Sequence, residues 1–233
     1  MSENPTVFFR VGSVPEQKLR LDPEEISHLK ALRVFAEDKV VQLKDGRGSV
    51  STYQIPAGKK EGDLVQTARI EPSKQTFQLA SAVPKGNRLE WLIQKGTELG
   101  ITHFIFLVFG HSDRKEVNPD RLLRVAAEAC SQSHRDFLPE IIGPIQFIKF
   151  VESFSKPSKE LLLLNPEGKI SANPELLQGR TVIVGPEGGF RKEELELCNV
   201  KNIPNVNAGS SILRIETAGL YAASLFRLGQ LEE

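Results

Sequence analysis

The chain has 233 residues, of which 39% are hydrophobic and 26% charged, and its 30 basic and 30 acidic side chains give a formal net charge of zero. This composition is typical of a globular protein with room for one large domain or two smaller ones. Balanced charge argues against a long-range field that would gather nucleic acid nonspecifically, although a local basic patch is compatible with it.

Several other classes of protein are disfavoured. The first ten residues lack the basic and apolar regions of a signal peptide, and the longest apolar stretches, such as Ile105–Phe109, are only strand-length. Cys130 and Cys198 lie in half-apolar, apparently helical stretches, as expected of buried, reduced thiols. The four histidines are scattered without metal-ligand spacing. We therefore expect a cytoplasmic protein without a membrane segment or a metal.

Residues 1–72 are predicted to form a small β-barrel with one helix. Asp22 is the expected N-cap of a helix that runs to Arg33, because Pro23 suits the first position and Glu25 completes a capping box. Asp45-Gly46 is a hairpin turn signal. The predicted strands are Thr6–Val11, Lys39–Leu43, Ser49–Ile55 and Leu64–Ile70. Polar residues 71–74 interrupt this pattern, and the domain boundary is placed there.

Residues 73–233 alternate between strands and helices. Strands are expected over Phe77–Val83, Phe104–Phe109, Leu161–Leu164, Thr181–Val184 and Asn205–Val206. Helices are expected over Arg88–Leu99, which Gly100 stops, Arg121–Ser133, which Asn118 caps, Arg191–Cys198 and Ile212–Leu228. Strands that are apolar on both faces predict an α/β domain with a mostly parallel sheet covered on both sides.

Three loops with glycine follow strands of this predicted sheet. They are Asn165–Gly168, Gly185–Phe190 and Asn207–Ser211. Ligands bind beyond the carboxyl ends of strands in such sheets, and glycine lets the backbone approach them closely. Each loop alone reads equally well as a tight turn. The strings match neither a dinucleotide fingerprint nor a P-loop, and Glu187 without a nearby lysine disfavours a phosphate.

Two longer strings carry a family resemblance. VIVGPEGGF (Val182–Phe190) and SILRIETA (Ser211–Ala218) resemble the 16S rRNA uridine N3-methyltransferase family, of the ribosomal RNA small subunit methyltransferase E type, in the knotted SPOUT superfamily. Segments Pro84–Gly100 and Glu128–Pro139 agree in order and spacing, and His28–Arg33 and Asp45–Gly48 resemble the family's N-terminal domain.

This resemblance implies a fold and a reaction that the periodicity does not reveal. It implies a PUA-like RNA-binding β-barrel over residues 1–72 and a deep trefoil knot within residues 73–233. It also implies a homodimer that methylates N3 of one uridine in 16S rRNA of the small ribosomal subunit. The donor, S-adenosyl-L-methionine, is expected in the knot, against Leu164, Asn165, Pro166, Gly185, Pro186, Glu187, Gly188, Ala208, Gly209, Ser211, Ile212 and Leu213.

The catalytic candidates are one cation and two carboxylates. Arg214 could stabilise charge that develops on a uracil carbonyl oxygen, or it could simply tie down Glu128 or Glu216. Glu98 and Glu128 are candidate carboxylates that a structural ion pair would explain equally well. The general base is not identified by these patterns.

Candidate RNA contacts lie in both halves of the chain. They are Arg10, His28, Arg33, Arg47, Gln132 and Arg135, each of which could instead be an ordinary surface side chain. The family usually has Leu-Gly-Pro-Arg where this chain has Ala208-Gly209-Ser210-Ser211. This departure favours an alternative function, a non-catalytic RNA-binding or ribosome-assembly factor that keeps the fold. A nucleotide-binding enzyme is a weaker third reading.

Overall fold

The computed structural model describes residues 5–113 and 116–230. The chain divides into two compact units, and the first combines Met1–Ser73 with Cys130–Leu138. The second combines Lys74–Ala129 with Pro139–Glu233. Each unit is described by itself.

The first unit is built on a curled sheet. Among the described residues this sheet has five strands in the order β1-β3-β4-β5-β2, with β1 parallel to β3 and the other pairs antiparallel. The strands are β1 (Thr6–Phe9), β2 (Lys18–Arg20), β3 (Lys39–Lys44), β4 (Ser49–Ile55) and β5 (Glu61–Arg69). Leu29, Val41, Tyr53 and Ile55 are buried beneath it. Strands β1 and β2 are the edges of this ladder, so the closed PUA-like barrel stays a prediction.

The predicted start of the helix in this unit is confirmed. Helix α1 (Pro23–Ala31) begins with the expected capping box, since Asp22 Oδ1 accepts from the Glu25 amide at 2.8 Å and Glu25 Oε2 accepts from the Asp22 amide at 2.9 Å. The helix ends before the predicted Arg33, whose φ of 63° is left-handed. Strand β2 was not predicted, because three residues are too few to show an alternating pattern.

The β3–β4 hairpin forms where the sequence predicted a turn, and a distant segment packs against it. Gly46, with φ of 74°, occupies this turn, and a Cβ there would lie 2.5 Å from Leu138 Cδ1. The Leu138 amide donates to the Gly46 carbonyl at 3.0 Å, and Lys44 Nζ lies 2.6 Å from Asp136 Oδ1. Ser131 Oγ donates to the Val7 carbonyl at 3.0 Å. Residues 130–138 therefore complete the first unit, although they are far from it in sequence.

The second unit contains the predicted parallel sheet. In the described part of the chain this sheet has seven strands in the order β10-β12-β9-β11-β6-β7-β8, and its recorded pairings are all parallel. The strands are β6 (Gln78–Ala82), β7 (His103–Val108), β8 (Glu140–Gln146), β9 (Leu161–Leu164), β10 (Ile170–Ser171), β11 (Thr181–Val184) and β12 (Asn205–Asn207). Strands β9 and β11 are buried throughout, as their apolar sequences predicted.

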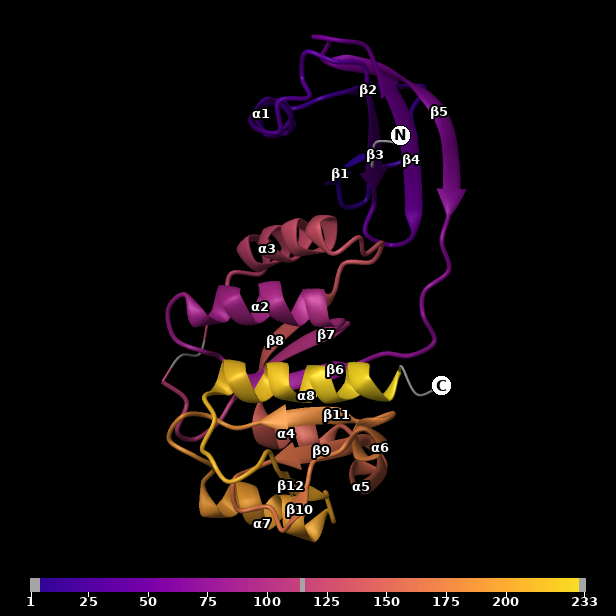
Figure 1. Cartoon of the computed structure of the whole chain (residues 1–233). Coiled ribbons are helices and arrows are strands. Elements are labelled where there is room, and N and C mark those ends of the chain that lie inside the picture. The colour runs from indigo at the N-terminus through magenta and orange to yellow at the C-terminus, as the bar shows by residue number, and fades with distance from the viewer. Residues whose placement is uncertain (1–4, 114–115, 231–233) are drawn as a thin grey trace. The chain divides into compact units, whose positions relative to one another are not determined.

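Helices cover this sheet. They are α2 (Arg88–Leu99), α3 (Pro119–Gln132), α4 (Phe147–Glu152), α5 (Pro157–Glu160), α6 (Pro174–Leu177), α7 (Lys192–Val200) and α8 (Ile215–Gly229). Figure 1 shows α8 in front of the sheet, over β6 and β11, and α4 behind it. Helix α8 also packs on α2. The sequence prediction of helices on both faces is confirmed.

Two local signals in this unit also hold. Gly100 ends α2 in the left-handed conformation, with φ of 100°. Asn118 Oδ1 accepts from the Arg121 amide at 3.1 Å, as expected of the cap of α3.

The last helix starts later than predicted. Helix α8 begins at Ile215, with Arg214 as its N-cap in an extended conformation, so residues 212–214 belong to the preceding loop. The apolar side chain of Ile212 suggested that the helix starts earlier, yet it is 85% exposed. The assignment of Ile212 and Arg214 to the first turn was therefore wrong.

Strands β8 and β10 and the short helices α4, α5 and α6 were not predicted. Strand β8 contains Gly143-Pro144, with a cis peptide bond, and this dipeptide reads as a turn in a sequence. It is an edge strand with no buried residue, so it lacks the apolar run of a central strand.

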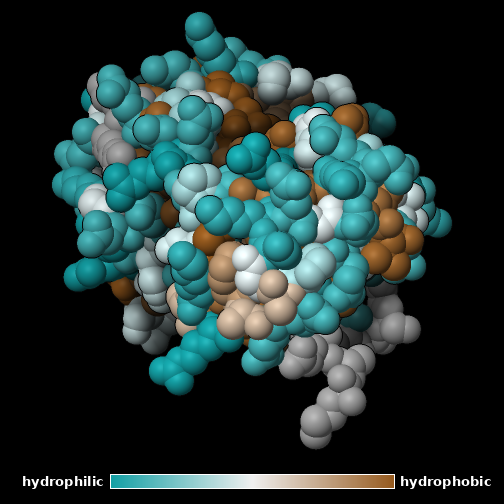
Figure 2. All heavy atoms as spheres, turned by 90° about the horizontal axis from the view of Figure 1, so that it is seen from above, coloured by the Kyte–Doolittle hydropathy of each residue, from teal (hydrophilic) through white to brown (hydrophobic). Residues whose placement is uncertain are grey.

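Figure 2 shows a face on which hydrophilic side chains predominate and hydrophobic ones are gathered in separate small areas. No helix in the described ranges is both long and apolar enough to cross a membrane.

Candidate functional site

The three glycine-bearing loops meet at one edge of the sheet. Strands β9, β11 and β12 are neighbours in register, with Val184 beside Leu164 and Leu164 beside Val206. Because these strands are parallel, their carboxyl ends and the loops that follow lie side by side. The convergence that the sequence suggested is therefore present in the structure.

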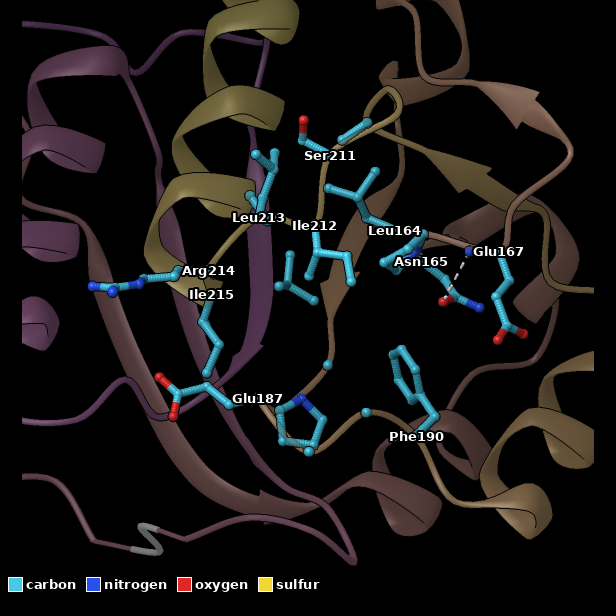
Figure 3. A pocket seen from close by; sticks show the side chains of 18 of the residues that line it. Leu164, Asn165, Glu167, Glu187, Phe190, Ser211, Ile212, Leu213, Arg214 and Ile215 are labelled. Atoms are coloured by element: carbon cyan, nitrogen blue, oxygen red, sulfur yellow. Dashed lines mark hydrogen bonds between the residues drawn. The ribbon is translucent and has the colours of Figure 1, made fainter.

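A cavity of about 420 Å³ lies between these loops (Figure 3). Its volume falls in the range of about 300–1,000 Å³ that is typical of small-molecule sites. It is lined by Leu164, Asn165, Pro166, Glu167, Val184, Gly185, Pro186, Glu187, Gly188, Gly189, Phe190, Leu195, Ala208, Ser211, Ile212, Leu213, Arg214, Ile215 and Ala218. Most of this lining is apolar side chain or loop backbone.

Hydrogen bonds hold the β9 and β12 loops together. The Asn165 amide donates to the Val206 carbonyl at 2.9 Å, and Asn207 Nδ2 donates to the Gly168 carbonyl at 2.8 Å. Asn207 Oδ1 also accepts from the Gly209 amide at 3.0 Å. Gly168 allows this approach, because a Cβ there would lie 2.3 Å from the Val206 carbonyl carbon. These bonds fix the loops that follow β9 and β12, whose backbones form one wall of the cavity.

The Gly185–Phe190 loop forms the opposite wall. A Cβ on Gly185 would lie 2.6 Å from the Phe190 ring, so this glycine lets the ring fold back over the loop. The Phe190 ring packs edge-on against Phe109, with 5.4 Å between centroids. His111 Nδ1 lies 3.2 Å from the Gly189 carbonyl oxygen, which ties the loop after β7 to this wall.

Charged side chains surround Glu187 at the end of the cavity. Arg88 Nη1 lies 2.6 Å from Glu187 Oε1, and Lys85 Nζ lies 3.7 Å from Glu187 Oε2. Lys85 also lies 2.7 Å from Asp113 Oδ2, and this ion pair raises the pKa of Lys85 and lowers that of Asp113. Contrary to the expectation from the sequence, Glu187 therefore has a lysine nearby, and its charge is compensated.

Lys85 and Arg88 were not singled out from the sequence, although both lie in the Pro84–Gly100 string. They follow β6, which is the neighbour of β11 in the sheet. The order of strands in the sheet would have located them, and that order cannot be read from periodicity. Glu167 and Phe190 line the cavity and were likewise missing from the candidate residues.

The residues expected to bind the donor are gathered at this cavity. Leu164, Asn165, Pro166, Gly185, Pro186, Glu187, Gly188, Ala208, Ser211, Ile212 and Leu213 line it. Gly209 does not line it, but its amide bonds to Asn207 in the same loop.

Of the three catalytic candidates, Arg214 alone lines the cavity. Its side chain is exposed, and Figure 3 shows it directed away from Leu164 and Glu167. Within the described residues the Arg214 guanidinium has no hydrogen bond or ion pair, so the suggested tie to Glu128 or Glu216 is not formed. The second candidate, Glu98, forms an ion pair with Lys95, with 2.8 Å between Nζ and Oε1.

Neither Glu98 nor Glu128 lines the cavity. Glu98 is ten residues along α2 from Arg88, or about 15 Å at the helical rise. Glu128 is exposed on α3. The structure does not bring either carboxylate to Arg214.

The six candidate RNA contacts all belong to the first unit, because Gln132 and Arg135 lie in its 130–138 segment. Arg10 is held by Glu25 through two bonds, at 2.9 and 2.5 Å, which raise the pKa of the guanidinium. His28 packs edge-on against Phe8, and the Arg47 backbone bridges to Phe137. Arg33 and Gln132 are exposed and Arg135 is half-buried. Their contact with RNA stays a prediction.

The thiols behave as buried apolar groups. Cys130 and Cys198 are free and buried, and burial raises the pKa of each to about 11. In the described ranges, no three side chains among His, Cys, Asp and Glu cluster to hold a metal ion.

Known proteins resemble the chain in sequence along most of its length. A family model described as an RNA methyltransferase domain matches residues 71–227. Ribosomal RNA small subunit methyltransferase E of Bacillus subtilis is 34% identical over 224 residues, which cover 86% of both chains. The Synechocystis protein of that name is 35% identical over 229 residues, covering 90% of this chain and 74% of its own.

Solved structures agree in fold. A structure from Porphyromonas gingivalis, described as a "probable rRNA-methyltransferase", has a TM-score of 0.79 and 28% identity and covers 97% of this chain and 98% of its own. The Neisseria gonorrhoeae ribosomal RNA small subunit methyltransferase E, solved bound to S-adenosyl methionine, has a TM-score of 0.78 at 23% identity, with the same coverage. The chain therefore belongs to the RNA methyltransferase family, and within it to the ribosomal RNA small subunit methyltransferase E proteins.

Proposed function

We propose that this protein transfers a methyl group from S-adenosyl-L-methionine to N3 of one uridine in 16S rRNA. The observation that supports this most is the cavity of about 420 Å³ at the carboxyl ends of β9, β11 and β12. It has the volume of a small-molecule site, its walls are apolar and backbone, and Arg214 stands on its lining. The donor supplies an electrophilic methyl group carried on a sulfonium.

The residues present fit such a donor. Leu164, Val184 and Leu213 offer an apolar surface for a base, and the loop backbones offer hydrogen-bonding groups. Asn165 and Glu167 place polar groups at the opposite side from Arg214 (Figure 3). Glu167, which also lines the cavity, suits a ligand that carries positive charge.

Arg214 is assigned an electrostatic role. A uracil N3–H is a poor nucleophile until its proton leaves, and negative charge then spreads onto the carbonyl oxygens O2 and O4. A guanidinium at O2 or O4 stabilises that charge. Arg214 fits because it is exposed beside the cavity and has no competing ion pair with the described residues. Glu98 is engaged by Lys95, so the base is to be sought elsewhere.

The wider assembly is also a proposal. The first unit would bind RNA as a PUA-like domain, through Arg33, Arg47 and Arg135 in particular. The second unit would be knotted, with the last strands and α8 threaded through the preceding chain. The active form would be a homodimer that works on the small ribosomal subunit in the cytoplasm. The family resemblance supports these four points.

The decisive experiment combines donor binding with RNA analysis. Calorimetric titration with S-adenosylmethionine should give saturable binding without added metal. Mass spectrometry of 16S rRNA from cells with and without the gene should differ by one methyl group on a uridine. Identical rRNA from both strains would contradict the proposal.

A second function is favoured by one feature of the loop. Ser210 and Ser211 stand where relatives are expected to carry a proline and an arginine, and Ser211 lines the cavity. An RNA-binding or assembly factor without catalysis would bind 16S rRNA but not the donor. The same titration therefore separates the two functions.

A further inference from the structure

Arg88 lies where its own helix disfavours a cation. It is the first residue of α2, and the partial positive charge at a helix N-terminus repels a guanidinium. Two carboxylates compensate for this: Arg88 Nη1 lies 2.6 Å from Glu187 Oε1 and 3.9 Å from Glu216 Oε1. One guanidinium therefore stands between the Gly185–Phe190 loop and the first turn of α8.

The two carboxylates are satisfied to different degrees. The Glu187 side chain is 31% exposed, and Lys85 gives it a second cation. The Glu216 side chain is only 6% exposed, and its Oε2 is buried with no hydrogen-bond partner among the described residues. A buried charge with incomplete compensation is costly, so the site around Glu216 favours a closer approach of Arg88.

Packing keeps the ends of the two helices near each other. A Cβ on Gly219 would lie 2.7 Å from Leu79 Cδ2 and 3.3 Å from Leu92 Cδ1, so the absence of a side chain lets α8 lie directly on β6 and α2. The helices cannot separate without losing this contact. The Arg88 side chain is 30% exposed and reaches both carboxylates from the N-terminus of α2.

We infer that Arg88 is a positioning residue for methyl transfer, which links Glu187 at the cavity to Glu216 beside Arg214. A bound ligand that interacts with the Glu187 carboxylate weakens the ion pair between Glu187 and Arg88. The Arg88 guanidinium can then move closer to Glu216. Because Glu216 is two residues after Arg214, this contact fixes the first turn of α8 and with it the direction of the Arg214 side chain. The inference rests on the proposed function.

Glu216→Gln separates this role from a purely structural one. The amide has the same shape and removes the incompletely compensated charge, so the melting temperature should stay constant or rise. With donor and small ribosomal subunits both saturating, kcat should still fall about tenfold or more, because the link to Arg88 is lost. A variant that keeps the wild-type kcat would overturn the inference, as would one whose activity falls only in step with its stability.

Arg88→Gln and Arg88→Lys test the other side of the link. Arg88→Gln should lower kcat about 10- to 100-fold, and Arg88→Lys should recover part of it, since an ammonium is a single point charge that serves one carboxylate better than two. The matched control is Arg121→Gln. Arg121 Nη2 lies 2.7 Å from Glu90 Oε1, also on α2, and neither residue lines the cavity.

The control should keep kcat within about twofold of the wild type, as expected for an exposed ion pair. If Arg88→Gln behaves like Arg121→Gln, the inference fails while the proposed function stands. Titration of the wild type with S-adenosylmethionine is done first. Absence of donor binding there would contradict the proposed function itself, and the positioning role with it.

Discussion

Lys44 and Asp136 are 92 residues apart in the sequence and form a 2.6 Å ion pair inside the first unit. The Lys44 side chain is only 7% exposed, whereas Asp136 is 30% exposed. Lys44 comes from the end of β3, and Asp136 from the segment that packs on the β3–β4 hairpin. This ion pair therefore holds residues 130–138 against strand β3.

Asp136→Ala should destabilise the first unit. It leaves a buried ammonium without its carboxylate, which costs roughly 2–4 kcal/mol at a site that is partly open to solvent. Urea unfolding monitored by circular dichroism measures the change. Glu196→Ala is the control, because its pair with Lys192 is exposed and should contribute about 0.5 kcal/mol or less. Equal effects of the two substitutions would show that Lys44 does not depend on Asp136.

Arg214→Ala should slow methyl transfer while leaving the affinity for the donor almost unchanged. Arg214 lines the cavity with its side chain directed away from Leu164, so the donor dissociation constant should change by about threefold or less. The rate of methyl transfer at saturating donor should fall roughly 10²–10³-fold, as for the loss of one electrostatic stabiliser. Calorimetry measures the donor dissociation constant, and single-turnover transfer to the 16S rRNA of small ribosomal subunits measures the rate. Full activity in this variant would show that the role of Arg214 is misassigned.

Gly168→Ala should damage the cavity wall. The added methyl would lie 2.3 Å from the backbone of Val206, which cannot move as a side-chain end can. We expect a loss of roughly 2 kcal/mol or more of stability together with weaker donor binding. Gly179→Ala is the control, since a Cβ there meets nothing within 4 Å and adds only the strain of its left-handed φ. Wild-type donor affinity in Gly168→Ala would contradict the close approach of the two loops.

The buried thiols should make stability depend on alkaline pH. Burial raises the pKa of Cys130 and Cys198 from 9.0 to about 11, so the folded state holds their protons more tightly than the unfolded chain. The resulting stabilisation is fully present below pH 9 and is lost as the pH rises from 9 toward 11. Native protein at pH 8 should react slowly with iodoacetamide and rapidly in denaturant. Fast alkylation of the native protein would contradict the burial.

Features of the fold with a local cause could be predicted. The capping box at Asp22, the Gly100 stop and the Asn118 cap each depend on residues within one turn, and all three are present. Buried strands such as Leu161–Leu164 could be predicted because their sequence is apolar without interruption. The start of α8 was misplaced because Ile212 has the spacing of a helical core residue and is instead exposed at the cavity.

Features that depend on distant pairing could not be predicted. Arg88 and Glu187 are 99 residues apart, and nothing near either of them indicates the other. Their meeting depends on β6 lying beside β11, which is a property of strand order. The loops of the site could be predicted because glycine after a buried strand is a local signal. Lys85 and Arg88 beside Glu187 were missed because their position depends on which strands are neighbours, and no local signal shows that.

The packing of Leu138 against Gly46 has a consequence for the order of events during synthesis. The first unit is not complete when residue 73 leaves the ribosome, because Asp136 and Leu138 have still to be made. At roughly 5–20 residues per second, the β3–β4 hairpin waits several seconds for its partner segment. By then most of the strands of the second unit are still to come. The N-terminal unit therefore matures in the middle of translation, and a fragment cut at residue 73 carries a hairpin whose buried lysine has no counter-charge.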